Sequence, residues 1–153
     1  MRIVLLGVKG VGKTTVGEKL AKALNLSFID TDQVMEKLIK KRTCDIFLQK
    51  GEQLFREIER DVLSQVKANI IAVGGGTVLA EENRKILRSM GHLICLYMRK
   101  EEVLSRWKDW PSVCQNFDHY YEERMEALRS LPCTWVDATR LDLIPILLRV
   151  VCG

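Results

Sequence analysis

A lysine and a threonine that directly follow a glycine-rich stretch are the residues of this chain best suited to chemistry. Residues 7–15 read G-V-K-G-V-G-K-T-T and fit the pattern G-x-x-x-x-G-K-[ST]. In this pattern, backbone N–H groups wrap phosphates, the lysine reaches the β- and γ-phosphates, and the next hydroxyl binds Mg²⁺. The sequence therefore predicts a P-loop that binds a nucleotide through its phosphates. Its expected phosphate contacts are Gly10, Val11, Gly12, Lys13, Thr14 and Thr15.

The residues around this loop predict the context that a P-loop requires. Residues 3–6 are apolar and read as a short buried strand, and apolar residues recur at helical spacing from Val16 to Leu24. A strand, a glycine-rich loop and a helix in this order bring the positive end of the helix dipole to the bound phosphates.

Chemistry-bearing residues also follow two other predicted strands. Asp30 and Asp32 come after residues 27–29, and three consecutive glycines, Gly74, Gly75 and Gly76, come after residues 70–73. Ligands of open α/β sheets bind at the carboxyl ends of the strands, so these groups are expected to meet there. Asp30 is the natural candidate for the acid beside Mg²⁺. Both aspartates also suit the cap of the next helix, because aspartate is a preferred N-cap.

Alternating strands and amphipathic helices predict an α/β fold. The near-continuous apolar strands favour a five-stranded parallel sheet covered by helices on both faces, the three-layer architecture of P-loop proteins. One helical stretch, from about residue 44 to residue 67, has a possible break at Gly51. The strands are predicted at residues 3–6, 27–29, 70–73, 93–97 and 134–136.

Length and composition are those of one globular domain. The chain has 153 residues, 47% of them hydrophobic and 29% charged, with a net charge of +4. There is no Lys/Arg tract that would indicate nucleic-acid binding, and a mild positive charge suits anionic substrates. No apolar run approaches 18 residues and no signal peptide precedes the first strand, so a cytoplasmic protein without a membrane segment is expected. The five cysteines and two histidines lack metal-ligand spacing and predict free thiols.

Several elements occur together in the order in which shikimate kinases carry them, and on these residues the chain resembles the shikimate kinase family. The resemblance is close over about residues 1–106 and loose over the rest. Besides the P-loop it rests on F-I-D-T-D at 28–32, D-I-F at 45–47, G-E at 51–52, F-R-E-I-E at 55–59 and V-G-G-G-T-V at 73–78.

This resemblance implies an enzyme that transfers the γ-phosphoryl group of ATP to the 3-hydroxyl of shikimate with the help of Mg²⁺. The product would be shikimate 3-phosphate, an intermediate of aromatic amino acid biosynthesis. It also implies a single P-loop kinase domain over residues 1–153, expected as a monomer without nucleic-acid or membrane partners. Its parts are a core of about residues 1–30, 68–106 and 132–153, substrate-binding helices over about 32–67 and a lid over about 107–120.

The family's site residues carry over onto matching positions of this chain. Lys13 and Asp32 would be catalytic, and Thr14 and Asp30 would serve the metal. Two arginines would bind the shikimate carboxylate, because a forked guanidinium matches a carboxylate with two parallel hydrogen bonds. The substrate-binding residues implied are Asp32, Arg56, Gly74, Gly75, Gly76 and Arg124; Arg106 would lie near the adenine, and Phe47 and Phe55 would line the pocket.

The match fails in the predicted lid. Shikimate kinases usually carry R-P-L-L there, whereas this chain has Trp110 where that arginine would align if Pro111 anchors the alignment. Two other hypotheses therefore remain open: a related small-metabolite kinase similar to gluconate kinase, and a nucleotide-binding module without catalysis. Trp107 and Trp110 are placed on the lid, and Trp135 is expected in the core.

Overall fold

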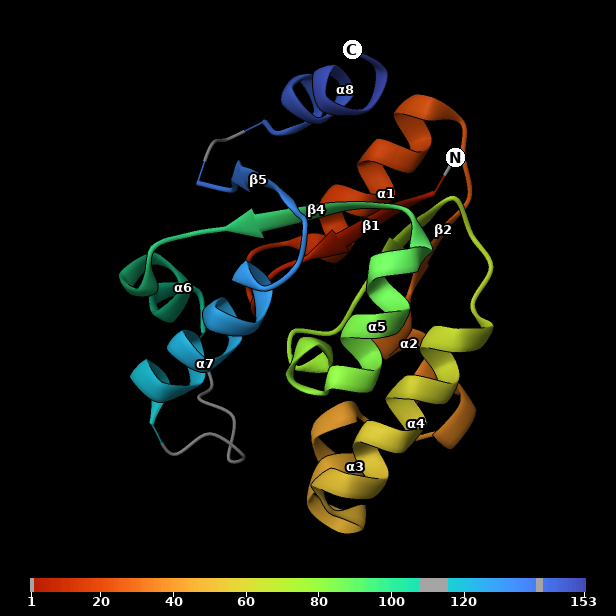
Figure 1. Ribbon diagram of the computed structural model, residues 1–153, viewed down its shortest axis with the longest axis vertical. Helices are drawn as coiled ribbons and strands as arrows, with labels where there is room; N and C mark the ends of the chain where they lie inside the picture. Colours follow the sequence, from red (N-terminus) through yellow and green to blue (C-terminus); the bar gives the residue numbers. More distant parts are fainter. Residues whose placement is uncertain (1, 108–115, 140–141) are drawn as a thin grey trace.

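The computed structural model describes residues 2–107, 116–139 and 142–153, and its centre is a parallel β-sheet (Figure 1). The order β2-β3-β1-β4-β5 places β1 between β3 and β4, with Val4 opposite Ile71 on one side and Leu93 on the other. All four pairings are parallel, which confirms the predicted five-stranded parallel sheet. The strands are β1 (Ile3–Leu6), β2 (Phe28–Asp30), β3 (Ile70–Ala72), β4 (His92–Tyr97) and β5 (Thr134–Asp137).

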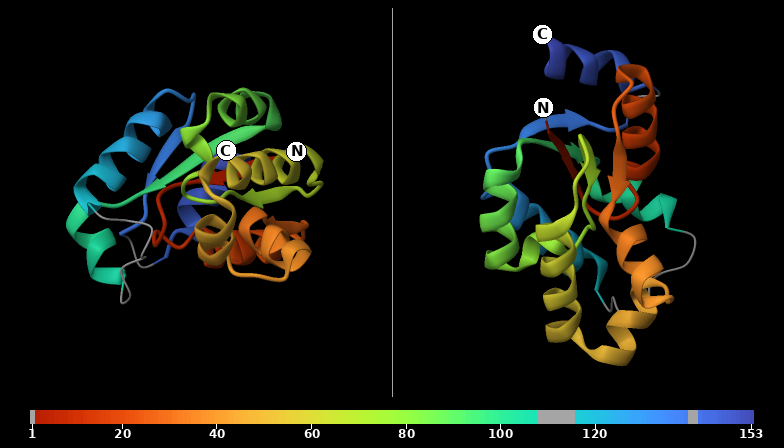
Figure 2. Two further views of the ribbon diagram at one scale, coloured as in Figure 1. Left: turned by 90° about the horizontal axis from the view of Figure 1, so that it is seen from below. Right: turned by 90° about the vertical axis from the view of Figure 1, so that its right-hand side faces the viewer.

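Helices cover both faces of this sheet, as predicted. α1 and α8 pack against each other on one face, and α5 lies on the opposite face (Figure 2). α2, α3 and α4 form a group at one end of the sheet, in the lower part of Figure 1. The helices are α1 (Lys13–Leu24), α2 (Thr31–Ile39), α3 (Thr43–Lys50), α4 (Glu52–Gln65), α5 (Glu81–Met90), α6 (Lys100–Arg106), α7 (Phe117–Arg129), α8 (Ile144–Cys152) and the 3₁₀ helix η1 (Thr77–Leu79).

Local residue choices set where the helices near the P-loop and at the end of the sheet begin. Gly12 adopts φ +91° immediately before α1, a conformation that glycine reaches without strain. Asp30 caps α2, because its side chain accepts a hydrogen bond from the backbone N–H of Gln33 at 3.1 Å. Gly51, with φ +83°, separates α3 from α4, so the expected break in this helical stretch is present.

Three differences from the expected elements are found. α6 and η1 were not predicted, because short helices carry little hydrophobic periodicity. Trp135, expected in the core, is 36% exposed, so that expectation is wrong. It lies on β5, an outer strand of the sheet, and its ring contacts the Tyr97 ring at a centroid distance of 5.9 Å. Most of the predicted lid, Trp110 included, lies outside the described residues.

Among the helices that are described, none is both long and apolar enough to cross a lipid bilayer.

Candidate active site

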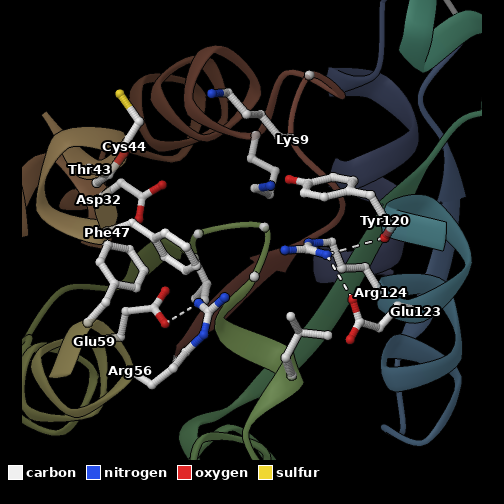
Figure 3. Close-up of a pocket in the computed structure, with 18 of the residues that line it drawn as sticks. Lys9, Asp32, Thr43, Cys44, Phe47, Arg56, Glu59, Tyr120, Glu123 and Arg124 are labelled. Carbon is white, nitrogen blue, oxygen red and sulfur yellow. Dashed lines mark hydrogen bonds and ion pairs between the residues drawn. The ribbon is translucent and has the colours of Figure 1, made fainter. Parts of the chain in front are cut away.

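A cavity of about 750 Å³ opens at the carboxyl ends of β1, β2 and β3 (Figure 3). The P-loop and the glycine turn after β3 form its floor, while α3, α4 and α7 contribute its sides. Most residues predicted for the site therefore come together from distant parts of the chain. Those that line the cavity are Gly10, Gly12, Lys13, Thr14, Thr15, Asp30, Asp32, Phe47, Phe55, Arg56, Gly74, Gly75, Gly76 and Arg124.

Two predicted nucleotide contacts do not line this cavity. Val11 is 2% exposed and its side chain belongs to the core. Arg106 lies at the end of α6 and donates a 3.4 Å hydrogen bond to the carbonyl of Gly10. Arg106 is thus beside the P-loop but outside the cavity wall.

The P-loop lysine is held against the loop that it serves. The Lys13 ammonium donates hydrogen bonds to the carbonyl oxygens of Gly7 and Val8. Burial lowers the pKa of Lys13 to about 8, while the nearby charges of Asp32 and Asp30 oppose this shift. A buried ammonium with a lowered pKa gains much from a phosphate, because the anion replaces the lost hydration.

The Thr14 hydroxyl donates a hydrogen bond to one carboxylate oxygen of Asp30, whose other oxygen caps α2. Asp30 can therefore cap α2 and contact Thr14, the expected Mg²⁺ ligand, at the same time. Hydroxyl and carboxylate oxygens are ligands that Mg²⁺ accepts, usually together with substrate phosphates and water. Over the described ranges no cluster of three or more His, Cys, Asp or Glu side chains that could hold a metal ion is found.

The three glycines after β3 allow three other groups to approach the turn. A Cβ atom on Gly75 would lie 2.9 Å from the backbone nitrogen of Lys9, and one on Gly76 would lie 2.8 Å from the Arg56 guanidinium. Gly74 faces the Asp32 carboxylate, and its N–H donates to the Thr31 hydroxyl at 3.2 Å. Any side chain in this turn would push apart the P-loop, the aspartate and the arginine.

Arg56 is anchored by a buried network. Its Nη1 lies 2.5 Å from Oε1 of Glu59, which is 4% exposed, and Oε2 of Glu59 accepts a 2.7 Å hydrogen bond from Thr77. The guanidinium also lies over the rings of Phe47 and Phe55, at 5.9 and 5.2 Å from their centroids. Its Nε is buried, has no hydrogen-bond partner among the described residues and lies 3.9 Å from Oε1 of Glu52.

Arg124 approaches the same glycine from the other side of the cavity (Figure 3). Its guanidinium stacks on the Tyr120 ring at 3.5 Å and pairs with Glu123 at 3.3 Å. Its Nε, too, is buried without a partner in the part of the chain that is described. Buried donors normally have acceptors, so two arginines with orphan N–H groups form a site for a planar anion such as a carboxylate.

Asp32 lines the same cavity, with its carboxylate against Gly74 and the charge of Lys13 nearby. Burial raises the pKa of Asp32 to about 6, and the neighbouring charges of Asp30 and Glu59 add to the shift. A carboxylate with such a pKa is ionised at neutral pH and still accepts a proton readily, which suits a group that positions a hydroxyl and receives its proton.

Sequence reasoning missed several groups that shape the site. Glu59 is the last residue of the F-R-E-I-E motif, but no role was predicted for it. Its spacing of three residues from Arg56 nevertheless predicts an ion pair on one face of a helix. Lys9, Tyr120 and Glu123 line the cavity, but Lys9 stands at an unrestricted position of the P-loop pattern and no pattern gave any of the three a role. Trp107 donates a 2.9 Å hydrogen bond to the Lys9 carbonyl across 98 positions of sequence, which no local pattern reveals.

Comparison with known proteins identifies the family. The sequence description of the shikimate kinase family matches residues 9–135, more than half of the chain. This chain belongs to the shikimate kinase family. It is 44% identical over 115 residues to the shikimate kinase of Caldanaerobacter subterraneus and 42% identical over 107 residues to that of Moorella thermoacetica. These stretches cover 71% and 68% of this chain, and 67% and 62% of the relatives, about two thirds of their length.

Solved shikimate kinases share the fold over the whole chain. The enzyme from Aquifex aeolicus superimposes with a TM-score of 0.86 at 29% identity, covering 100% of this chain and 97% of that one. The shikimate kinase from Acinetobacter baumannii in complex with shikimate gives a TM-score of 0.83 at 28% identity, covering 99% and 90%. A deoxyadenosine kinase from M. mycoides with bound dATP, at 14% identity and a TM-score of 0.60, shares the fold alone.

Proposed function

We propose that this protein is a shikimate kinase, which transfers the γ-phosphoryl group of ATP to the 3-hydroxyl of shikimate and forms shikimate 3-phosphate. The observation that carries the proposal is a pair of arginines, the largely buried Arg56 and the buried Arg124, that face Gly76 in the same cavity as the P-loop. A related protein in the family has been solved with shikimate bound, which supports the same acceptor here.

In this proposal the arginines fix the shikimate ring. Each guanidinium gives its free donors to the carboxylate, and together they compensate its charge as the ring leaves water. The acceptor must then present its 3-hydroxyl toward the P-loop, on the side where Asp32 lies. Holding two reactants in this way supplies much of the rate of phosphoryl transfer, since little covalent chemistry is asked of the protein.

Asp32 accepts a hydrogen bond from the reacting hydroxyl and takes its proton as the new P–O bond forms. The oxygen bridging the β- and γ-phosphates leaves with the electron pair of the broken bond, so ADP is released. Lys13 binds the phosphate oxygens throughout. Thr14, through its hydroxyl, and Asp30 are the residues that would hold Mg²⁺, which would neutralise phosphate charge when bound.

The cellular setting follows from this activity. A shikimate kinase acts on small soluble metabolites in aromatic amino acid biosynthesis, so we propose a cytoplasmic monomer with ATP and shikimate as its only substrates. Neither nucleic acid nor membrane enters this proposal.

An ADP-release assay with ATP, Mg²⁺ and shikimate tests the proposal, run beside gluconate and a control without acceptor. Shikimate-dependent ADP formation is expected, and mass spectrometry of the product should find one phosphate on shikimate. ADP formation with gluconate alone would assign the protein to a different small-metabolite kinase. No turnover with any acceptor, while ATP still binds, would instead indicate a nucleotide-binding module without catalysis.

A further inference from the structure

We propose that Lys9, the third residue of the P-loop pattern, is a second catalytic cation of this chain. Its ammonium binds the γ-phosphoryl group during transfer, beside Lys13. The inference rests on the proposed function, because it concerns the same phosphoryl transfer.

The backbone places Lys9 where the nucleotide loop meets the acceptor turn. Its nitrogen lies so close to Gly75 that a Cβ atom there would come within 2.9 Å. In the same turn, Gly74 faces the Asp32 carboxylate, and Gly76 faces the two arginines of the acceptor site. A phosphoryl group that moves from the P-loop to an acceptor held by those residues must pass beside Lys9.

The Lys9 side chain is available for an anion at this boundary. Lys9 lines the cavity (Figure 3) and is an exposed residue, and its side chain makes no hydrogen bond or ion pair with any other residue that the structure describes. Lys13, by contrast, donates to two carbonyl oxygens of the loop. Although burial is the main cause of the low pKa of Lys13, the positive charge of Lys9 contributes to it. Two ammonium groups that repel each other form a site for a multiply charged anion.

Contacts from α6 and the residue after it hold the Lys9–Gly10 segment in place without using the lysine side chain. Trp107 donates to the Lys9 carbonyl at 2.9 Å, and Arg106 donates to the Gly10 carbonyl at 3.4 Å. The Trp107 ring packs in turn against Phe117 and Tyr120, at centroid distances of 5.3 and 5.1 Å. The lysine side chain thus extends from a fixed peptide, and its replacement leaves these contacts intact.

The chemical role of Lys9 is electrostatic. As the bond from the γ-phosphorus to the bridging oxygen breaks and the bond to the acceptor oxygen forms, negative charge is carried on the three equatorial oxygens of the phosphoryl group. The Lys9 ammonium stabilises this charge, while the hydroxyl proton goes to Asp32. A preorganised cation of this kind serves the transition state more than either ground state. In this chain Trp110 stands at the position where shikimate kinases usually carry the lid arginine. Lys9 would supply a positive charge from the P-loop instead.

The test compares Lys9→Met, which keeps the length of the side chain and removes its charge, with Lys9→Arg, which keeps the charge. Lys22→Met removes the same charge from an exposed position in the last turn of α1 and is the matched control. We expect kcat of Lys9→Met to fall about 100-fold, the lower end of the range for losing one transition-state donor. The KM for shikimate should change less than about 3-fold, and Lys9→Arg should recover at least a tenth of the wild-type kcat. The Lys22→Met variant should match the wild type.

A kcat of Lys9→Met within about 3-fold of wild type would overturn the proposal, and so would an equal loss of kcat in Lys22→Met.

Measurements of nucleotide affinity distinguish failure of the Lys9 proposal from failure of the proposed function. If the wild type shows no turnover with shikimate, the dissociation constants of Mg·ADP and of Mg²⁺ with a non-hydrolysable ATP analogue still report on Lys9. Lys9→Met should weaken the triphosphate analogue about 10-fold and leave ADP within about 2-fold. Equal effects on both nucleotides would show that Lys9 does not bind the γ-phosphoryl group.

Discussion

Arg56 and Glu59 carry opposite charges in the wall of the acceptor site, and their burial makes them depend on each other. The arginine side chain is 14% exposed and the glutamate side chain 4% exposed. A buried ion pair offers little net stability, but removing one partner leaves the other charge uncompensated. Glu59 is therefore a positioning residue: it holds the guanidinium toward Gly76, leaving the arginine's other donors for substrate.

Replacing Arg56 by alanine should weaken shikimate binding by about 2–4 kcal/mol, the range for a buried charge pair that loses one partner. In a steady-state assay this corresponds to a rise of roughly 30-fold or more in the KM for shikimate. The KM for ATP should change little, because the P-loop is not part of this network. Arg60→Ala, one residue beyond Glu59 on the same helix, is the control; an unchanged shikimate KM in Arg56→Ala would show that Arg56 does not bind the acceptor.

The two titrating groups of the site predict a bell-shaped pH profile of kcat/KM for ATP, which reports on the free enzyme. Asp32, with its pKa raised to about 6, must be ionised to accept the proton, so activity falls as the pH drops below 6. Lys13, with its pKa lowered to about 8, must be charged to bind phosphate, so activity falls as the pH rises above 8. Rates measured between pH 5 and pH 9.5 check both limbs. A flat profile down to pH 5 would contradict the role given to Asp32.

At the scale of elements, α6 and α7 support the P-loop through aromatic side chains. Trp107, directly after α6, contacts the Lys9 carbonyl, and its ring packs on Phe117 and Tyr120 of α7. Tyr120 in turn lies flat on Arg124. An unbroken series of contacts thus runs from the nucleotide loop to an arginine of the acceptor site.

Trp107 should therefore report nucleotide binding by fluorescence. In a variant with Trp110→Phe and Trp135→Phe, which leaves Trp107 as the one indole, adding ATP should change the intensity or wavelength of emission, because the loop that Trp107 touches gains phosphate charge. Adding Trp107→Phe to a single Trp135→Phe background tests the reverse. If the response survives there undiminished, it does not come from Trp107.

Local motifs let the sequence predict the elements that meet at the site, but not the contacts between them. The P-loop, Asp30 and the glycine turn each follow a strand, so a parallel sheet brings them to one edge once the strands are recognised. The contact of Trp107 with Lys9 joins residues 98 positions apart, and the exposure of Trp135 depends on β5 being an outer strand. Both depend on the tertiary arrangement, for which hydrophobic periodicity contains no signal.

At the scale of the whole molecule, the site is built at the expense of stability. Asp32 is ionised at neutral pH although the fold raises its pKa from 3.8 to about 6. Between these two values the folded state binds the proton more tightly than the unfolded state does, so this group makes the protein less stable as the pH rises through that window. Above pH 6 the full penalty is present.

Asp32→Asn should therefore stabilise the fold while it removes activity. At pH 7.5 the free energy of unfolding is expected to rise by on the order of 3 kcal/mol, from the size of the pKa shift. The gain should shrink as the pH falls from 6 toward 4, where the wild-type carboxyl is protonated in the folded state. Urea unfolding of both proteins at several pH values measures this difference. A variant that is less stable at pH 7.5 would show that Asp32 is held by favourable contacts instead.

The same cavity of about 750 Å³ extends from the P-loop to the arginine pair without an intervening side chain in the glycine turn. One inhibitor can therefore occupy both halves at once: a phosphate chain against Lys13, joined through a short linker to a carboxylated ring against Arg56 and Arg124. Once the first half is bound, the second meets its site at an effective concentration in the millimolar range. Such a compound gains selectivity as well as affinity, because nucleotide-binding proteins that share the loop but lack the arginines bind only half of it.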